Sequence, residues 1–275
     1  MFQPGLLQGR RILVTGGGTG LGLAMATRFA ELGATLILCG RRQGVLDEAA
    51  RTIGAGTETH SLDLRDALAV DAMMARIFAT GPLDVLVNNA AANFIARSET
   101  LSPRAMDAVL NITLHGPMYC SMAAGRRWIE AKRPGVILSI VATYAWHGSP
   151  YVVPSAAAKA GVLAMTRSLA AEWGRHGIRA NAIAPGPFPT KGAWERLLPR
   201  PDLAEHFEKR GPLGRAGRHE ELANLAAFLV SDMAGYITGD CITIDGGRWV
   251  KNAGNFSFLD SLSDAEWDSF RPKKG

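Results

Sequence analysis

The sequence predicts an α/β fold: a single domain built on a doubly wound parallel sheet with helices on both faces. Two features of the 275 residues carry this prediction. Short apolar segments alternate with longer segments of helical periodicity. The apolar segments also lack the in–out alternation of strands that face water on one side. With right-handed crossovers, such a sheet places its ligands beyond the carboxyl ends of its strands.

Strands and helices are expected to follow one another along most of the chain. The predicted strands cover residues 11–15, 35–39, 57–61, 84–88, 136–140, 179–184 and 241–245. The predicted helices cover residues 21–32, 45–52, 67–79, 103–130, 156–173 and 220–231. The fourth helix has a clear start, because Ser102 can act as N-cap and Pro103 suits the first helical position.

No repeat or low-complexity linker divides the chain, so residues 1–275 are predicted to form one domain. The segment at about 187–217 is rich in proline and glycine, and we expect a flap over the ligand site there rather than a domain boundary. Residues from about 248 to 275 are expected to form a C-terminal extension.

Composition excludes several classes of function. Hydrophobic residues make up 47% of the chain and charged residues 20%, as in a globular protein with a large core. The net charge of +5 comes from scattered basic residues, which favours a phosphate-rich small molecule over nucleic acid. No apolar run is long enough for membrane insertion, and residues 1–9 do not resemble a secretory signal.

Cys39, Cys120 and Cys241 are expected to be reduced, in a cytoplasmic protein. His115 and His147 show no ligand spacing, so no metal is expected.

A glycine-rich segment, TGGGTGLG at residues 15–22, follows the first predicted strand and opens the first predicted helix. Glycines let the backbone approach a pyrophosphate, and the helix N-terminus offers free N–H donors. A tight turn alone would also explain the glycines, but the strand–loop–helix context favours a nucleotide.

The end of the second strand distinguishes the two nicotinamide cofactors. An acidic residue there would bind the ribose 2′-hydroxyl, whereas this chain has Arg41 and Arg42 after Gly40. Arginine suits the additional 2′-phosphate, so NADPH is expected. The alternative is that both arginines are merely solvated surface residues.

Several ordered motifs carry a family resemblance. They are Thr15-Gly16-x-x-x-Gly20-x-Gly22, Asp63-Leu64, Asn88-Asn89-Ala90, Asn111, Lys159 and Pro185-Gly186-x-x-x-Thr190. Over residues 9–247 the chain resembles the short-chain dehydrogenase/reductase superfamily, which implies a Rossmann fold. The resemblance implies that Lys159 binds the nicotinamide ribose and that residues 185–190 hold the carboxamide. The full set implied for the cofactor is Gly16, Thr19, Gly20, Leu21, Arg41, Arg42, Asp63, Leu64, Asn89, Lys159, Pro185, Gly186, Phe188 and Thr190.

The chain departs from the superfamily's Tyr-x-x-x-Lys pattern, because Ser155 occupies the tyrosine position before Lys159. A tyrosine instead lies 15 residues before the lysine, at Tyr144. This arrangement, together with Asn93-Phe94, Leu101-Ser102-Pro103 and the tail through Glu266-Trp267-Asp268, resembles the mitochondrial-type 2,4-dienoyl-CoA reductases.

That resemblance implies a reaction and a site. The reaction is NADPH-dependent reduction of 2,4-dienoyl-CoA to 3-enoyl-CoA in the β-oxidation of unsaturated fatty acids, by a homo-oligomer that is commonly a tetramer. Tyr144 and Asn93 would contact the thioester carbonyl, and Ser155 and Lys159 would complete the catalytic set. Contacts with the acyl-CoA would come from Arg65, Phe94 and Ser102.

The chemistry suits these groups. Reduction at the far end of a conjugated thioester moves negative charge onto the carbonyl oxygen, which Asn93 and Tyr144 could stabilise as hydrogen-bond donors. The nearby cation of Lys159 is expected to make the tyrosine more acidic. Ser155 shares a helical face with the lysine but is too weak an acid to replace a phenol.

Other interpretations remain open from the residues. A carbonyl reductase acting on ketones or 3-oxoacyl groups could use Tyr144 or Tyr151 as its acid, and a nucleotide-sensing scaffold would need no acid at all. Tyr144 could simply pack under a loop, and Asn93 could simply form a turn. The apolar residues Phe188, Trp194, Leu197 and Leu198 could form a lid or pack in an ordinary way.

Overall fold

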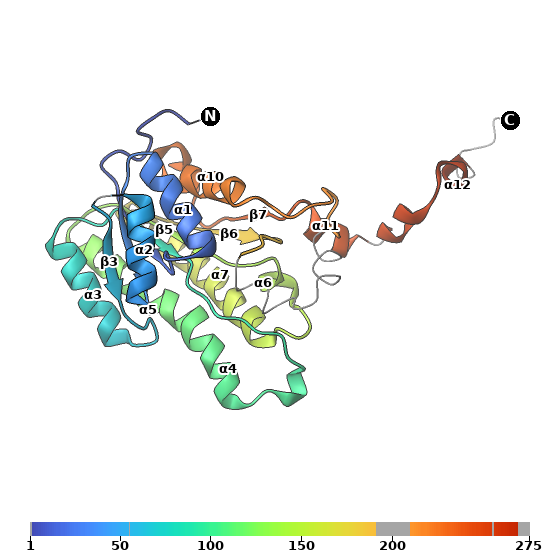
Figure 1. The fold of residues 1–275 in the computed structure, drawn as a ribbon, viewed down its shortest axis with the longest axis horizontal. Coiled ribbons are helices and arrows are strands. Elements are labelled where there is room, and N and C mark those ends of the chain that lie inside the picture. The colour runs from blue at the N-terminus through green and yellow to red at the C-terminus, as the bar shows by residue number, and fades with distance from the viewer. Residues whose placement is uncertain (1, 55, 191–209, 255, 269–275) are drawn as a thin grey trace.

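Seven parallel strands form one sheet in the computed structural model, which describes residues 2–54, 56–190, 210–254 and 256–268 (Figure 1). The strands are β1 (Arg11–Thr15), β2 (Thr35–Gly40), β3 (Glu58–Ser61), β4 (Val85–Asn88), β5 (Gly135–Ile140), β6 (Ile178–Pro185) and β7 (Cys241–Ile244). Their order across the sheet is β3-β2-β1-β4-β5-β6-β7, and every neighbouring pair is parallel. The order reverses between β1 and β4, as it does in a doubly wound fold.

Helices cover both faces of this sheet. Those flanking the strands are α1 (Gly20–Glu31), α2 (Gln43–Ile53), α3 (Ala67–Ala79), α4 (Pro103–Leu110), α5 (Gly116–Glu130), α7 (Val153–Trp173) and α10 (His219–Val230). Shorter helices are α6 (Tyr144–His147), α11 (Arg248–Ala253) and α12 (Asp264–Asp268). The predicted fold class is therefore confirmed.

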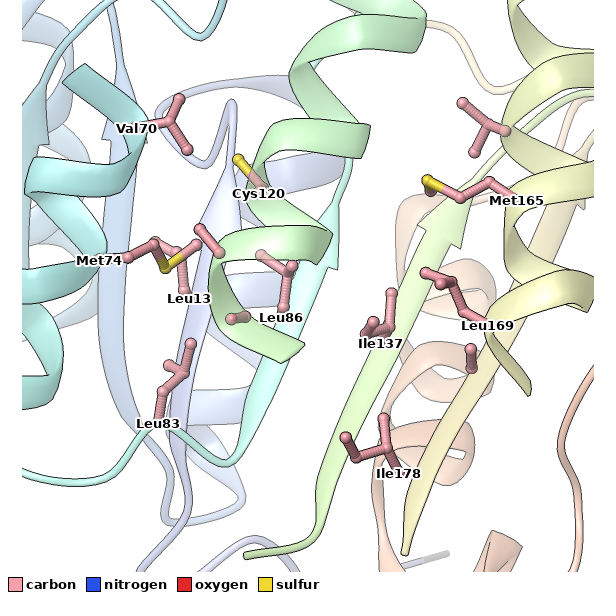
Figure 2. Packing of buried hydrophobic residues seen from close by; sticks show 14 of the residues in the cluster. Leu13, Val70, Met74, Leu83, Leu86, Cys120, Ile137, Met165, Leu169 and Ile178 are labelled. Atoms are coloured by element: carbon pink, nitrogen blue, oxygen red, sulfur yellow. The ribbon is translucent and has the colours of Figure 1, made fainter. Parts of the chain in front are cut away.

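Strand side chains alternate between two apolar clusters, one on each face. On one face, Leu13 of β1 packs in a cluster with Met74 of α3 and Cys120 of α5 (Figure 2). On the other face, Ile12 and Val14 of the same strand join residues of α1, α2 and α10. Since both faces are covered by apolar side chains, β1, β2 and β4 in the middle of the sheet are almost wholly apolar and show no in–out alternation.

Most predicted bounds agree with the structure to within one or two residues, and two predicted helices differ more. The helix expected over residues 103–130 is interrupted by a π-helical turn, η2 (Asn111–His115), which separates α4 from α5. The helix expected to begin at residue 156 begins at Val153, with Pro154 in its first turn, where a missing N–H costs nothing. Of the expected flap, the structure describes residues 187–190 and 210–217, so Trp194, Leu197 and Leu198 lie outside the described residues.

The structure also describes the cysteines, the lengths of the helices and the residues that could bind a metal. Cys39 and Cys120 are free and buried, and burial raises the pKa of Cys39 to about 12. No helix in the described ranges is long and apolar enough to cross a membrane. Within the same ranges, no cluster of His, Cys, Asp and Glu is suited to a metal ion.

Candidate active site

Three positions of the loop from β1 into α1 favour glycine. Gly16 and Gly20 have φ of +64° and +56°, a conformation that other residues rarely adopt. A Cβ on Gly17 would lie 2.7 Å from Leu38 Cδ2 and 3.0 Å from the carbonyl oxygen of Val14. The side chain of Thr19, which precedes α1, makes no capping hydrogen bond. A bare backbone and an uncapped helix N-terminus fit a pyrophosphate.

The side chain of Asn89 stabilises this loop by binding to the loop's backbone. Its amide nitrogen donates to the carbonyl oxygens of Thr15 (2.9 Å) and Gly16 (3.3 Å). In return, the hydroxyl of Thr15 accepts from the N–H of Asn89 (3.0 Å) and of Ala90 (3.1 Å). The end of β4 therefore fixes the shape of the glycine loop, and the side chain of Asn89 serves the loop itself.

Charges gather beyond β2 and β3. Arg41 and Arg42 are exposed, and the carbonyl of Arg41 accepts a bond from the hydroxyl of Ser61 (3.2 Å). Arg65 binds the carboxylate of Asp63 through Nε (2.9 Å) and a terminal nitrogen (2.5 Å). These hydrogen bonds hold the pKa of Asp63 below its ordinary value. The resemblance assigns Asp63 to the cofactor and Arg65 to the acyl-CoA, and the structure joins the two side chains in one ion pair.

Tyr144 lies beside the serine that replaces the usual tyrosine. Its hydroxyl is 3.0 Å from the hydroxyl of Ser155. Lys159, one turn further along α7, donates from Nζ to the carbonyl oxygen of Ile140 at the end of β5 (2.5 Å). Ser155 and Lys159 are both buried. The structure therefore brings together three of the four predicted catalytic side chains at the carboxyl ends of the strands.

The pKa of the tyrosine differs from the expectation. Burial raises the pKa of Tyr144 above its ordinary value, and the bond to Ser155 offsets this only in part. The expected acidification by Lys159 is therefore wrong, because burial dominates. Burial also lowers the pKa of Lys159 from 10.5 to about 8. Near neutral pH the site holds a protonated phenol and a lysine close to its titration point.

The segment that carries Asn93 is held at both ends. At Ala92, the hydroxyl of Thr113 accepts from the N–H (3.0 Å) and donates to the carbonyl oxygen (3.1 Å). At Ala96, the N–H donates to the carbonyl oxygen of Tyr151 (3.0 Å), a residue with φ of +65° and an exposed side chain. Between these points, Asn93 Oδ1 accepts from the N–H of Phe94 (2.9 Å). Its amide nitrogen is thereby kept available as a donor.

Thr113 belongs to the π-helical turn; the superfamily resemblance implies a kink of the long helix at Asn111, but the residues alone did not predict a π-helical turn. Asn111 opens this turn, and its side-chain oxygen is 2.8 Å from His115 Nδ1. Such turns insert one residue into a helix and occur frequently at functional sites. Here the turn lies next to the Asn93 segment. A polar residue inside a predicted helix was its only signal in the sequence.

The segment after β6 returns to the glycine loop. A Cβ on Gly20 would lie 3.2 Å from Thr190 Cγ2, and one on Gly186 would lie 2.6 Å from Asp245 Cβ. The side chain of Phe188 is buried in the core, so ordinary packing explains it. The remaining predicted residues have local roles as well: Leu64 is buried, Phe94 is half-buried, and Ser102 caps α4 by accepting from the N–H of Ala105.

An aromatic cluster beside α6 had no counterpart in the sequence analysis. The rings of Trp146 and Trp249 pack edge to face, with centroids 5.7 Å apart at 81°. The rings of His147 and Trp249 stack at 4.8 Å and 4°. Two of these residues belong to the helix that Tyr144 opens, and the third belongs to α11.

The glycine loop, the charged end of β2 and the buried Lys159 together fit a dinucleotide. The family model described as enoyl-(acyl carrier protein) reductase matches residues 16–248. A probable 2,4-dienoyl-CoA reductase of Bacillus subtilis, named as (2E)-enoyl-CoA-producing, is 47% identical over 89% of this chain and 98% of its own length. A probable 2,4-dienoyl-CoA reductase 3 of Caenorhabditis elegans, named as (3E)-enoyl-CoA-producing, is 43% identical over 97% of this chain and 90% of its own. The crystal structure of a short chain dehydrogenase from Bacillus anthracis superposes with a TM-score of 0.81 at 45% identity, covering 88% of this chain and 97% of the other.

Proposed function

The chain belongs to the short-chain dehydrogenase/reductase family, and we propose that it reduces 2,4-dienoyl-CoA thioesters with NADPH to 3-enoyl-CoA in unsaturated fatty-acid β-oxidation. As a member of this family it is an oxidoreductase with a nicotinamide cofactor. One observation carries the substrate proposal: the phenol of Tyr144 is 3.0 Å from Ser155, so the acid group is displaced from its usual helix but still lies at the site.

The bound cofactor supplies the hydride. Reduction at C5 of the dienoyl group moves electrons along the conjugated chain, so that negative charge accumulates on the thioester oxygen. A protonated Tyr144 and the free amide N–H of Asn93 are both suited to donate to that oxygen. The raised pKa of the tyrosine favours this role, since the phenol keeps its proton at neutral pH.

The position of the final proton determines the product. Protonation at C2, next to the carbonyl, leaves the double bond at C3, whereas protonation at C4 leaves it at C2. With Tyr144 and Asn93 donating to the thioester oxygen, as proposed, protonation at the adjacent C2 would give the 3-enoyl product. The two relatives above are named for different products, so the regiochemistry has to be measured.

Arg41 supports NADPH over NADH. It is exposed beyond the end of β2, where its guanidinium can reach a 2′-phosphate, and its main chain is held by Ser61. Asp63, the nearby carboxylate, is already paired with Arg65 and so adds little repulsion.

We also propose a cytoplasmic homo-oligomer, a tetramer. The exposed side chains of Met233 and Tyr236 lie between α10 and the edge strand β7, and apolar exposure beside a sheet edge favours a second copy. The free thiols suit a reducing compartment.

The test compares NADPH oxidation on a 2,4-dienoyl-CoA with oxidation on a panel of ketones and 3-oxoacyl-CoA, with the product's double bond located by NMR. Activity on carbonyl compounds alone would replace this proposal with a carbonyl reductase. Tight NADPH binding without turnover of any substrate would instead support a nucleotide-sensing scaffold.

A pair of matched variants identifies the acid. Tyr144→Phe should lower kcat by about 10²–10³-fold, as expected for loss of one oxyanion donor, without changing NADPH affinity. Tyr151→Phe makes the same change at the neighbouring exposed tyrosine and should keep most of the activity. The reverse ranking would assign the role to Tyr151.

A further inference from the structure

We propose that Trp249 is a positioning residue, which holds helix α6 and thereby sets the place of the Tyr144 hydroxyl. The inference rests on the proposed function, because it concerns the group that serves the thioester oxygen. It extends the site to the C-terminal segment that follows the sheet.

Helix α6 needs support from outside. It spans only Tyr144–His147, and a helix of this length has no stability of its own. On one side, Ala145 is buried in the core cluster shared with α7. On the other side, the rings of Trp146 and His147 both contact Trp249. The indole therefore covers the outer face of the helix that carries the phenol.

Trp249 is itself firmly anchored. The two carboxylate oxygens of Asp245 accept bonds from the N–H of Trp249 (2.6 Å) and of Gly247 (2.9 Å). Asp245 directly follows β7 and lies against Gly186 at the end of β6. Figure 1 shows α11 beyond the carboxyl ends of these two strands. The ends of β6 and β7 thus anchor the backbone of Trp249, the residue whose ring contacts α6.

Small displacements of the Tyr144 hydroxyl should lower the reaction rate. Its hydroxyl is 3.0 Å from that of Ser155, and displacing a group in a catalytic site by about 1 Å can cost about 10²-fold in rate. Edge-to-face and stacked ring pairs have preferred geometries, so they restrict how α6 can rotate or slide. The next residue on α11, Val250, is exposed and takes no part in these ring contacts, so it offers a matched control position.

The experiment measures steady-state kinetics of the full chain with NADPH and a 2,4-dienoyl-CoA. Trp249→Ala should lower kcat about 10–100-fold and leave the KM for NADPH within about twofold. Trp249→Phe, which keeps a ring, should recover most of the rate, and Val250→Ala should match the wild type. Should Trp249→Ala fold poorly, Trp146→Ala removes one of the two ring contacts and should also lower kcat, by a smaller factor.

A double variant separates positioning from general damage. In a Tyr144→Phe background, Trp249→Ala should cause no further loss of kcat, because the group that it positions is already gone. An equal loss in both backgrounds would overturn the proposal, and so would a wild-type rate in Trp249→Ala.

A spectroscopic readout is independent of the substrate. The chain has 4 tyrosines, so an ultraviolet titration compared between parent and Tyr144→Phe isolates the Tyr144 phenolate. Trp249→Ala should move that phenol's pKa down toward its ordinary value of 10.0, since loosening α6 admits water. An unmoved pKa would overturn the positioning role. If the wild type does not reduce dienoyl-CoA but Trp249→Ala still lowers the phenol's pKa, the proposed function alone is overturned and the positioning role stands.

Discussion

Replacing Lys159 by methionine should stabilise the protein relative to the wild type at neutral pH, and the gain should disappear in alkali. Lys159 is buried, with its pKa lowered from 10.5 to about 8 by loss of solvation. The folded protein therefore holds the proton less tightly than the unfolded chain does. The resulting destabilisation is complete below pH 8 and fades as the pH rises toward 10.5.

The magnitude follows from the two pKa values. The lowered pKa of Lys159 reduces the free energy of unfolding of the wild type by about 3 kcal/mol at pH 7 and by about 1 kcal/mol at pH 10. Methionine removes the charge and leaves the carbonyl of Ile140 without its donor, at a cost of about 1–3 kcal/mol that does not depend on pH. The advantage of the variant over the wild type should therefore shrink by about 2 kcal/mol between pH 7 and pH 10.

The assay is urea unfolding of both proteins at pH 7, 8, 9 and 10, followed by fluorescence. Lys132→Met makes the same chemical change at an exposed site and serves as the matched control. A difference for Lys159→Met that stays constant from pH 7 to pH 10 would refute the reasoning. The variant should also lose activity, so stability and turnover would change in opposite directions.

Substitutions at three further positions test separate parts of the site. Arg41→Ala should weaken NADPH binding about 10–100-fold while leaving NADH nearly unchanged, by fluorescence titration; equal losses would count against the phosphate contact. Asn93→Ala should lower kcat about 10²–10³-fold with little effect on the unfolding midpoint, and a rate within about threefold of wild type would remove its donor role. Thr113→Val leaves the N–H and carbonyl of Ala92 without their partner and should cost about 1–3 kcal/mol in stability as well as turnover, whereas Thr113→Ser should restore both. Equal behaviour of the two Thr113 variants would show that the hydroxyl is not needed.

The sheet could be predicted because most of its central strands are runs of apolar residues. β1 was predicted with the bounds Arg11–Thr15 that the structure has, and α3 with the bounds Ala67–Ala79. The resemblance implied a kink at Asn111, but the π-helical form of the turn at Asn111–His115 could not be predicted, because one inserted residue barely disturbs the apolar periodicity of a long helix. Helices α6 and α11 are too short to produce a periodic pattern at all.

The candidate site was predictable only in part. A resemblance, rather than local pattern, pointed to Tyr144, and the 3.0 Å approach to Ser155 required the fold. The direction of its pKa was predicted wrongly, because the burial of a side chain depends on residues far away in the chain. The contact of Trp249 with His147 joins segments that are far apart in the sequence, and no local signal reports it.

The hydrogen bonds at the two ends of the Asn93 segment determine when the entropy cost of ordering this segment arises, on folding or on ligand binding. A free loop would have to be ordered each time a ligand arrives, at about 1–2 kcal/mol for every residue fixed. Here the bonds at Ala92 and Ala96 set the backbone in advance, so that cost is met once, when the chain folds. A preorganised donor of this kind needs no rearrangement as charge develops, and it allows the amide to discriminate between ligands by geometry alone.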